Sequence, residues 1–439
     1  MARRRASGRT QYQTELQKAI RKFLPARGLP LVSKDDRVRW TDRMLVITAV
    51  LMTWALEPTL QDAFATGRGV VAAMYDSRRR PGRTLGGFLK ALARVSAGLI
   101  GVVVAALRLA VQRVAGSHWT HRGWVVMGVD GTRINCPRTV ANERAFGCAG
   151  KAGTTPQILL TMLFHVATGL PWAWHQGPGD GSERADLEAM LDLLPRCTLL
   201  LADAGYVGFD MMNSLLGGGQ SFIIRVGRNV HLLEELGYAV HEVKGTVYLW
   251  PKHRRNQPPL VLRLVRVRSG QQTVALLTNV SAASFSDREV AELYRRRWGI
   301  EVLYRSLKQT MQRRQMLSDR PKHAALELDW AVVGLWLLGL MTAEAASRGG
   351  RPPRSWSLAQ AQRVVRQAMR RLGKPRPAGG LRWQLRRAVK DTYVRRHPKA
   401  ARYWPRKKTE RPPGVPKIRT ATREEIRMAQ AFHQCTAPN

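Results

Sequence analysis

The sequence predicts an α/β protein with three consecutive regions: an all-α N-terminal domain (1–120), a mixed α/β domain (121–348) and a basic, helical or extended C-terminal region (349–439). Three observations support this prediction. Apolar residues recur at helical spacing before Trp124, short β-branched runs begin there, and Pro, Lys and Arg accumulate after Gly349. The length of 439 residues suits several domains, because a single hydrophobic core stops growing at roughly 250 to 300 residues.

The charge balance predicts a polyanionic partner. The chain has 72 lysine and arginine residues against 31 aspartate and glutamate residues, a formal net charge of +41. Arginine is mixed through segments with folded patterns, which suits bidentate phosphate binding, so we expect nucleic acid as the partner. The longest apolar runs, 97–107 and 330–343, are shorter than the roughly 20 residues that span a bilayer, so we expect buried helices and no membrane partner.

The N-terminus and the cysteines favour a reducing, cytoplasmic compartment. The stretch MARRRASGRT is basic but lacks the apolar core of a secretion signal after it. The cysteines lack the spacing of a zinc site or of a disulfide framework. They are Cys136, Cys148, Cys197 and Cys435.

The N-terminal region contains amphipathic and apolar segments of helical length. TELQKAIRKFL (14–24), WTDRMLVITAVLMTWAL (40–56) and residues 85–114 each predict a helix. Their arginines are suited to binding DNA or to solvating helix surfaces, and no helix-turn-helix pattern decides between the two.

The α/β domain opens with strand patterns. WVVMGVDGT (124–132) and CTLLLADAGYVG (197–208) predict buried strands that end at Asp130 and Asp203. Between about 225 and 281, alternating apolar and polar residues with intervening turns predict an insertion of antiparallel strands.

A long helix is predicted to begin after Ser286, which forms a capping box with Glu289, and to run through YRRRWGIEVLYRSLK (294–308). On one continuous helix, four polar side chains fall within about 60° of each other and face one ligand. They are Tyr294, Arg297, Glu301 and Lys308. The other faces carry residues expected in the core, namely Leu293, Trp298, Ile300, Leu303 and Leu307.

Each acidic residue has an ordinary structural explanation when taken alone. Glu301 has partners for a surface ion pair in Arg297 and Arg305, an arrangement worth about 0.3 to 0.5 kcal/mol. Asp130 and Asp203 precede Gly131 and Ala204, and each suits a turn.

The combination of the three carboxylates favours a shared site. Asp130 and Asp203 are predicted at strand ends, where ligands gather in open α/β sheets. Three carboxylates among many cations suit Mg²⁺, because hard cations prefer oxygen ligands and two such ions promote phosphodiester cleavage.

The spacing Tyr294, two residues, Arg297, three residues, Glu301, six residues, Lys308 resembles the YREK signature of bacterial insertion-sequence transposases of the insertion-sequence-four type. GVDGT around Asp130, ADAGY around Asp203 and RWGIE are also similar to that family. The resemblance covers roughly residues 124–345.

The resemblance implies an RNase H-like catalytic core whose DDE triad is Asp130, Asp203 and Glu301, with a β-strand insertion before the glutamate. It implies two Mg²⁺ ions, for which Mn²⁺ can substitute, and a grip on DNA by Tyr294, Arg297 and Lys308. The three carboxylates are then both the catalytic and the metal-binding residues.

The resemblance also implies an activity and partners. These are cut-and-paste transposition through a hairpin intermediate, binding of transposon ends and target DNA, a synaptic homodimer, and a prokaryotic cytoplasm with nucleoid association. Hairpin formation usually places a flipped base on an aromatic ring; Trp250 is a candidate, although core packing is the expected role. Two alternatives stay open: an RNase H-like nuclease without strand transfer, and an inactive DNA-binding derivative.

Overall fold

The computed structural model describes most of the chain. The described residues are 11–25, 40–74, 81–148, 154–240, 242–269, 272–370, 379–390 and 414–436. Much of the expected basic C-terminal region, residues 391–413, lies outside them.

The chain forms two compact units, each assembled from several segments. Unit 1 consists of Met1–Trp119, Gly131–Ser182 and Gly299–Lys390, and unit 2 of Thr120–Asp130, Glu183–Trp298 and Asp391–Asn439. Segments from all three regions expected from the sequence contribute to unit 1.

Unit 1 is mostly helical. Its helices are α1 (Gln11–Phe23), α2 (Asp42–Ala55), α3 (Leu60–Met74), α4 (Leu85–Ala115), α5 (Val140–Phe146), α9 (Gly299–Arg305), α10 (Pro321–Ser347), α11 (Leu358–Arg370) and α12 (Gly380–Arg387). The helices expected at 14–24, 40–56 and 85–114 are therefore present. An antiparallel hairpin of β2 (Gln157–His165) and β3 (Leu170–Pro178) completes the unit.

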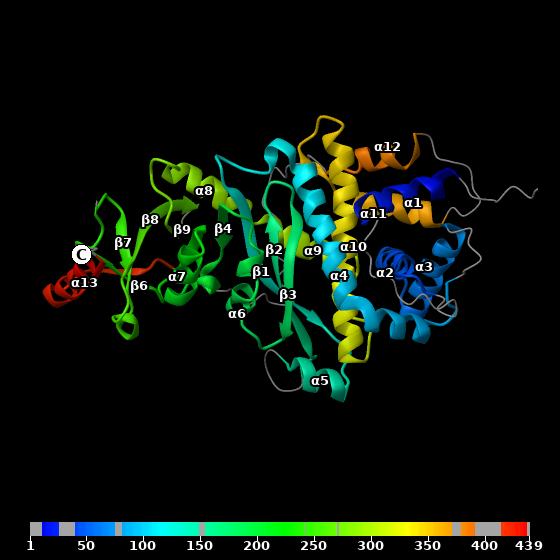
Figure 1. Cartoon of the computed structure of the whole chain (residues 1–439), viewed down its shortest axis with the longest axis horizontal. Coiled ribbons are helices and arrows are strands. Elements are labelled where there is room, and N and C mark those ends of the chain that lie inside the picture. The colour runs from blue at the N-terminus through cyan, green and yellow to red at the C-terminus, as the bar shows by residue number, and fades with distance from the viewer. Residues whose placement is uncertain are drawn as a thin grey trace, which may run out of the picture. The chain divides into compact units, whose positions relative to one another are not determined.

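Helix α10 is the core of unit 1. In Figure 1 it runs beside α4, and it also packs on α2. The indole nitrogen of Trp54 in α2 donates to the carbonyl of Gly334 at 3.0 Å, and that of Trp330 donates to Ser96 Oγ in α4 at 3.1 Å. A Cβ on Gly334 would lie 2.1 Å from Thr53 Oγ1, so only glycine permits this approach of α2 to α10.

Two helices of the described chain, Leu85–His118 and Pro321–Ser347, are long and apolar enough to cross a membrane. The apolar run 97–107 lies within the helix predicted at 85–114, whereas the run 330–343 belongs to a helix, α10, that is longer than the apolar run itself. Length and composition do not separate such helices from the core helices of soluble proteins. The most apolar stretch of α10 is 78% buried inside the protein, as predicted, whereas that of the helix Leu85–His118 is only 33% buried, so the buried helix predicted at 97–107 is largely wrong.

Glu327 and Arg313 form a buried ion pair in unit 1, with side chains 7% and 5% exposed. The carboxylate also accepts hydrogen bonds from the backbone N–H groups of Leu317 (2.9 Å) and Ser318 (3.0 Å). Glu327→Ala should lower the free energy of unfolding by about 3 kcal/mol or more, because a buried guanidinium and two amides lose their partner. Urea unfolding measures this. Glu344→Ala, at a more exposed pair, should cost about 1 kcal/mol or less, and an equal loss would contradict the prediction.

Asp329 is buried in α10, where its carboxylate accepts hydrogen bonds from Trp174 Nε1 (2.8 Å) and Gln176 Nε2. Burial raises the pKa of Asp329 from 3.8 to about 6. Because the folded pKa lies above the unfolded one, folding loses stability as pH rises through this window. Asp329→Asn, which retains an acceptor oxygen, should therefore raise the free energy of unfolding by about 2 to 3 kcal/mol at pH 8, and by little near pH 4. Urea unfolding at both pH values measures this, and a gain independent of pH would contradict it.

Unit 2 is built on a mixed sheet. Its strands are β1 (Val125–Asn135), β4 (Thr198–Ala202), β5 (Ser221–Val226), β6 (His231–Glu234), β7 (Thr246–Leu249), β8 (Leu260–Ser269), β9 (Gln272–Thr278) and β10 (Lys417–Thr420). They are ordered β10-β6-β7-β8-β9-β5-β4-β1. Helices α6 (Glu183–Glu188), α7 (Phe209–Gly217), α8 (Asp287–Arg296) and α13 (Arg423–Thr436) belong to this unit.

Strand direction divides the sheet of unit 2. β1, β4 and β5 are parallel, with Val125 opposite Thr198 and Leu199 opposite Ser221, and β5, β9, β8, β7 and β6 are antiparallel. The insertion predicted at about 225–281 thus consists of strands, and it extends the sheet from β5. The predicted α/β fold, a mixed sheet flanked by helices with a helical N-terminal region, is confirmed.

The C-terminal segment 414–436 packs on the insertion in unit 2. β10 pairs in parallel with β6, and Glu425 at the start of α13 lies 2.6 Å from both Arg255 and Arg419. Trp250 is 2% exposed, its indole nitrogen donates to a carbonyl at 2.7 Å, and the Arg255 guanidinium lies 4.1 Å from its ring centroid. Trp250 is therefore a core residue, the role that the sequence favoured.

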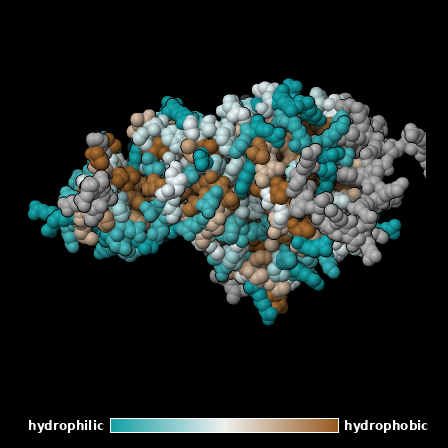
Figure 2. All heavy atoms as spheres, viewed as in Figure 1, coloured by the Kyte–Doolittle hydropathy of each residue, from teal (hydrophilic) through white to brown (hydrophobic). Residues whose placement is uncertain are grey.

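Polar residues cover much of the face in view in Figure 2, with hydrophobic residues between them. Large exposed hydrophobic side chains occur in both units, including Leu109 of α4 and Val240 after β6. Single exposures of this kind are normal at protein surfaces.

Candidate active site

Asp130 lies within strand β1, not at its end. The parallel pairing of β1 with β4 covers Val125 to Gly128, so Asp130 follows the paired stretch by two residues. The strand continues through Gly131 to Asn135, so the predicted strand end at Asp130 is wrong. Cross-strand contacts overrode the local turn preference of the Asp-Gly pair. The Asp130 side chain is 21% exposed.

Asp203 occupies the predicted strand end. Strand β4 ends at Ala202, and Asp203 is the N-cap of a short 3₁₀ helix, Ala204–Tyr206. Its Oδ1 accepts a hydrogen bond from the backbone N–H of Ala204 at 2.7 Å, which fixes the carboxylate at the sheet edge. The side chain is 39% exposed, so this carboxylate is both anchored and accessible.

Arg297 joins the two aspartates. Its Nη1 lies 3.4 Å from Asp130 Oδ2 and its Nη2 lies 3.7 Å from Asp203 Oδ2. The arginine residue is only 8% exposed, so its guanidinium is held in place by the protein. The structure therefore brings together three of the residues predicted from the sequence, with both carboxylates facing one guanidinium.

Tyr294 lies beside this cluster. The Arg297 guanidinium carbon is 5.7 Å from the centroid of its ring. Burial, with a smaller contribution from Asp203, raises the pKa of Tyr294 to about 12, while Arg297 and Arg225 oppose the shift. The phenol is therefore protonated at neutral pH and retains an O–H donor.

Arg225 is a neighbour of the site that sequence reasoning missed. It lies in β5, between Ile224 and Val226, and its buried Nε has no hydrogen-bond partner among the described residues. The sequence did contain a signal for this residue, because Arg225 is a charged residue within a mostly apolar strand.

The predicted continuous helix is interrupted at Arg297 and Trp298. α8 ends at Arg296, α9 begins at Gly299, and the amides of Arg297 and Trp298 bond to carbonyls three residues back. The capping box of Ser286 and Glu289 is present as predicted. The prediction that Tyr294, Arg297, Glu301 and Lys308 share one face of a continuous helix is therefore wrong.

The core residues expected along this stretch are correct except one. Leu293, Ile300, Leu303 and Leu307 are buried, whereas Trp298 is 55% exposed, so its expected core position is wrong. The interruption turns Trp298 away from the face that a straight helix would have given it.

Glu301 and Lys308 lie in unit 1, whereas the aspartates, Tyr294 and Arg297 lie in unit 2. Glu301 is in the first turn of α9 and is partly exposed. Lys308 lies in a π-helical turn, Ser306–Thr310, and burial, together with Arg314, lowers its pKa. Turns of this type are uncommon in proteins, and those that do occur often lie at functional sites.

The paired aspartates have the donor chemistry for a divalent cation. Within the described residues, no group of three or more His, Cys, Asp or Glu side chains is close enough together to hold a metal ion. The Asp130 and Asp203 carboxylates nevertheless face the same guanidinium, and hard cations prefer oxygen ligands of this kind. These two side chains fit a site for such an ion.

Two comparisons with known sequences relate this chain to transposases. Residues 125–337 match the family model described as Transposase DDE domain. The chain is 31% identical over 230 residues to transposase InsG for insertion sequence element IS4 of Escherichia coli (strain K12). That match covers 49% of this chain and 51% of that protein, so the chain spans about half the length of this relative.

A cryo-EM structure of a piggyBac transposase synaptic complex with hairpin DNA aligns over 88% of this chain and 84% of that chain. The identity is 11% and the TM-score is 0.41, which is too low to support further argument. The residues that match the family model include both aspartates, Arg297 and Glu301. Residues 125–337 of this chain are thus similar to the transposase DDE domain family, and the chain is similar over 230 residues to a transposase of insertion sequence element IS4.

Proposed function

We propose that this chain is a cut-and-paste DNA transposase, which cleaves phosphodiester bonds at transposon ends and joins the ends to target DNA. The observation that carries the proposal is the convergence of Asp130 and Asp203, from neighbouring parallel strands, on Arg297 inside a transposase DDE domain. The net charge of +41 supports a polyanionic substrate.

Asp130, Asp203 and Glu301 are the proposed catalytic and metal-binding residues. DDE transposases use divalent metal ions, and we infer two Mg²⁺ ions here, replaceable by Mn²⁺. Ions bound there would activate the attacking oxygen and stabilise the leaving oxygen of the phosphodiester. The protein holds these carboxylates in position. The backbone N–H of Ala204 donates a hydrogen bond to Asp203, and Arg297 forms ion pairs with both aspartates.

Tyr294, Arg297 and Lys308 are the proposed contacts to DNA phosphates. The protonated Tyr294 phenol donates hydrogen bonds at neutral pH, and the guanidinium and the ammonium add charge-assisted donors. The partners are the inverted repeats at the transposon ends and the target DNA. Reaction through a hairpin intermediate, in a synaptic homodimer associated with the nucleoid of a prokaryotic cytoplasm, completes the proposal.

A strand-transfer assay tests this function. Purified protein, with DNA carrying the inverted repeats that flank its reading frame, should nick the ends in Mg²⁺ and join pre-cleaved 3′-OH ends to a target. EDTA should remove both activities. Nicking without joining would instead identify an RNase H-like nuclease. DNA binding without metal-dependent cleavage would identify an inactive DNA-binding derivative.

A further inference from the structure

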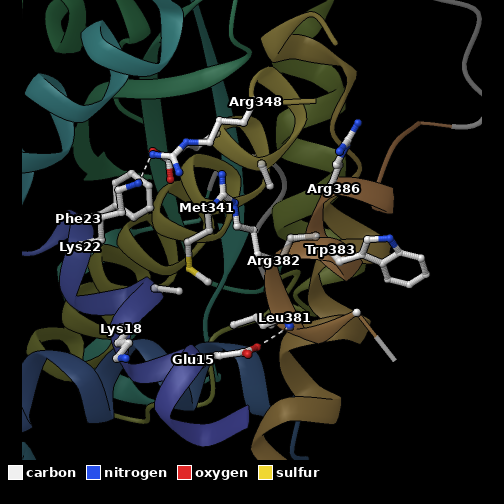
Figure 3. Close-up of a pocket in the computed structure, with 15 residues that line it drawn as sticks. Glu15, Lys18, Lys22, Phe23, Met341, Arg348, Leu381, Arg382, Trp383 and Arg386 are labelled. Atoms are coloured by element: carbon white, nitrogen blue, oxygen red, sulfur yellow. Dashed lines mark hydrogen bonds and ion pairs between the residues drawn. The ribbon is translucent and has the colours of Figure 1, made fainter. Parts of the chain in front are cut away.

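Unit 1 contains an open cavity far from the candidate active-site residues in sequence. Its volume is about 680 Å³, and α1, the C-terminal half of α10 and α12 line it. Figure 3 shows Phe23, Met341 and Leu381 among the side chains that surround it. This volume lies within the range of about 300 to 1,000 Å³ that is typical of small-molecule sites.

Two of the three helices, and the residue that follows the third, present cations to this cavity. α1 contributes Lys18 and Lys22, α12 contributes Arg382 and Arg386, and Arg348 follows the end of α10. The two pairs are four residues apart, which places both members of each pair on one helix face. Five cations therefore line one apolar cavity.

The acidic residues of the cavity already have partners inside the protein. Glu344 accepts from Lys22 and from Arg348 Nη2 at 3.1 Å, and Glu15 accepts from the backbone N–H of Leu381 at 2.7 Å. In contrast, three of the cations form no hydrogen bond or ion pair with another described residue. They are Lys18, Arg382 and Arg386. Among the described residues, the cavity thus combines an apolar wall with three cations that have no partner.

We propose that this cavity binds a nucleotide, with its base against the apolar wall and its phosphates on the cations. A purely apolar ligand would leave the cations without partners, and inorganic phosphate alone would leave the wall without contacts. A flat ring joined to phosphate matches both the apolar wall and the cations, since guanidinium and ammonium groups donate strong hydrogen bonds to phosphate. The ligand has two sources, a free nucleotide or a nucleotide of a DNA strand. The site uses none of the residues of the proposed catalysis, so it stands or falls independently of them.

Calorimetric titration of the full chain in EDTA tests the proposal without any DNA cleavage. ATP should bind at least about tenfold more tightly than inorganic triphosphate, because only ATP contacts the apolar wall. Equal affinities would overturn the proposal, because they indicate charge attraction alone.

Three variants locate the binding. Arg382→Ala combined with Arg386→Ala should weaken ATP and triphosphate binding by at least about tenfold each. Ala19→Leu, which extends an α1 side chain into the cavity, should reduce ATP affinity toward that of triphosphate. Arg363→Ala removes an exposed arginine of α11 outside the cavity and should leave both affinities nearly unchanged. Melting curves of each variant confirm folding, and an Arg363→Ala effect as large as that of the cavity arginines would overturn the proposal.

A short single-stranded oligothymidylate distinguishes the two sources. If it competes with ATP and loses affinity in the same variants, the ligand is a nucleotide of a DNA strand. If ATP binding responds to the variants and the oligonucleotide does not compete, the ligand is a free nucleotide. Absence of ATP binding, together with oligonucleotide binding that no cavity variant alters, would overturn the proposal.

Discussion

Asp203→Asn is expected to lower the rate of transposon-end cleavage by at least about a thousandfold, because the amide replaces a proposed metal-binding carboxylate with a neutral group. The substitution is nearly isosteric, and the amide oxygen can still accept the 2.7 Å hydrogen bond from Ala204 N–H. DNA binding and the melting temperature should therefore change little. End cleavage in Mg²⁺, measured beside a DNA-binding assay, checks this result.

Asp210→Asn is the matched control for that variant. Asp210 lies in the same unit, its side chain is 58% exposed, and its carboxylate pairs with Arg254 at 2.7 Å. It should cleave at close to the wild-type rate. Near-normal cleavage by Asp203→Asn, or an equal loss in both variants, would remove the basis for assigning Asp203 to catalysis.

Arg297→Met is expected to reduce end cleavage by about a hundredfold or more, because methionine fills the buried volume and supplies no charge-assisted donor. Arg297 contacts both Asp130 and Asp203 and is only 8% exposed. Its loss therefore leaves both carboxylates without this buried partner. Arg297→Lys should recover part of the activity, because an ammonium restores the charge and not the two-pronged geometry.

Arg288→Met separates this effect from a general loss of positive charge. Arg288 lies on α8, and its side chain is 89% exposed in a pair with Glu292. Cleavage by this control should fall only slightly. Cleavage by Arg297→Met at the level of Arg288→Met would show that the guanidinium does not organise the aspartates.

Local patterns in the sequence predicted much of the fold. The capping box at Ser286, the strand before Asp203 and the alternating run in the insertion all depend on neighbours within a few residues, and the structure contains each of them. The convergence of Asp130 and Asp203 follows from the parallel register of β1 and β4, in which Gly128 lies opposite Leu201 and each aspartate comes two residues later.

Features that depend on distant contacts were not predictable in the same way. The interruption before Gly299 coincides with tight tertiary packing, since a Cβ there would lie 2.9 Å from Arg354 Nη2 and 3.1 Å from Phe164 Cε2. The exposure of Trp298 follows from that interruption. Likewise, Lys417–Thr420 is a strand only because β6, far away in the sequence, offers an edge for pairing.

Asp130 and Asp203 of unit 2 are proposed to act with Glu301 of unit 1 on one metal site, and metal-directed cleavage of the protein measures this directly. With ascorbate and hydrogen peroxide added, Fe²⁺ bound in place of Mg²⁺ reduces the peroxide to hydroxyl radicals that cut the nearby backbone, and mass spectrometry locates the cuts. Cuts are predicted near all three residues in the wild-type chain and in Asp210→Asn, and their joint loss is predicted in Asp203→Asn. Cuts that spare the region of Glu301, or that persist unchanged in Asp203→Asn, would contradict a shared metal site.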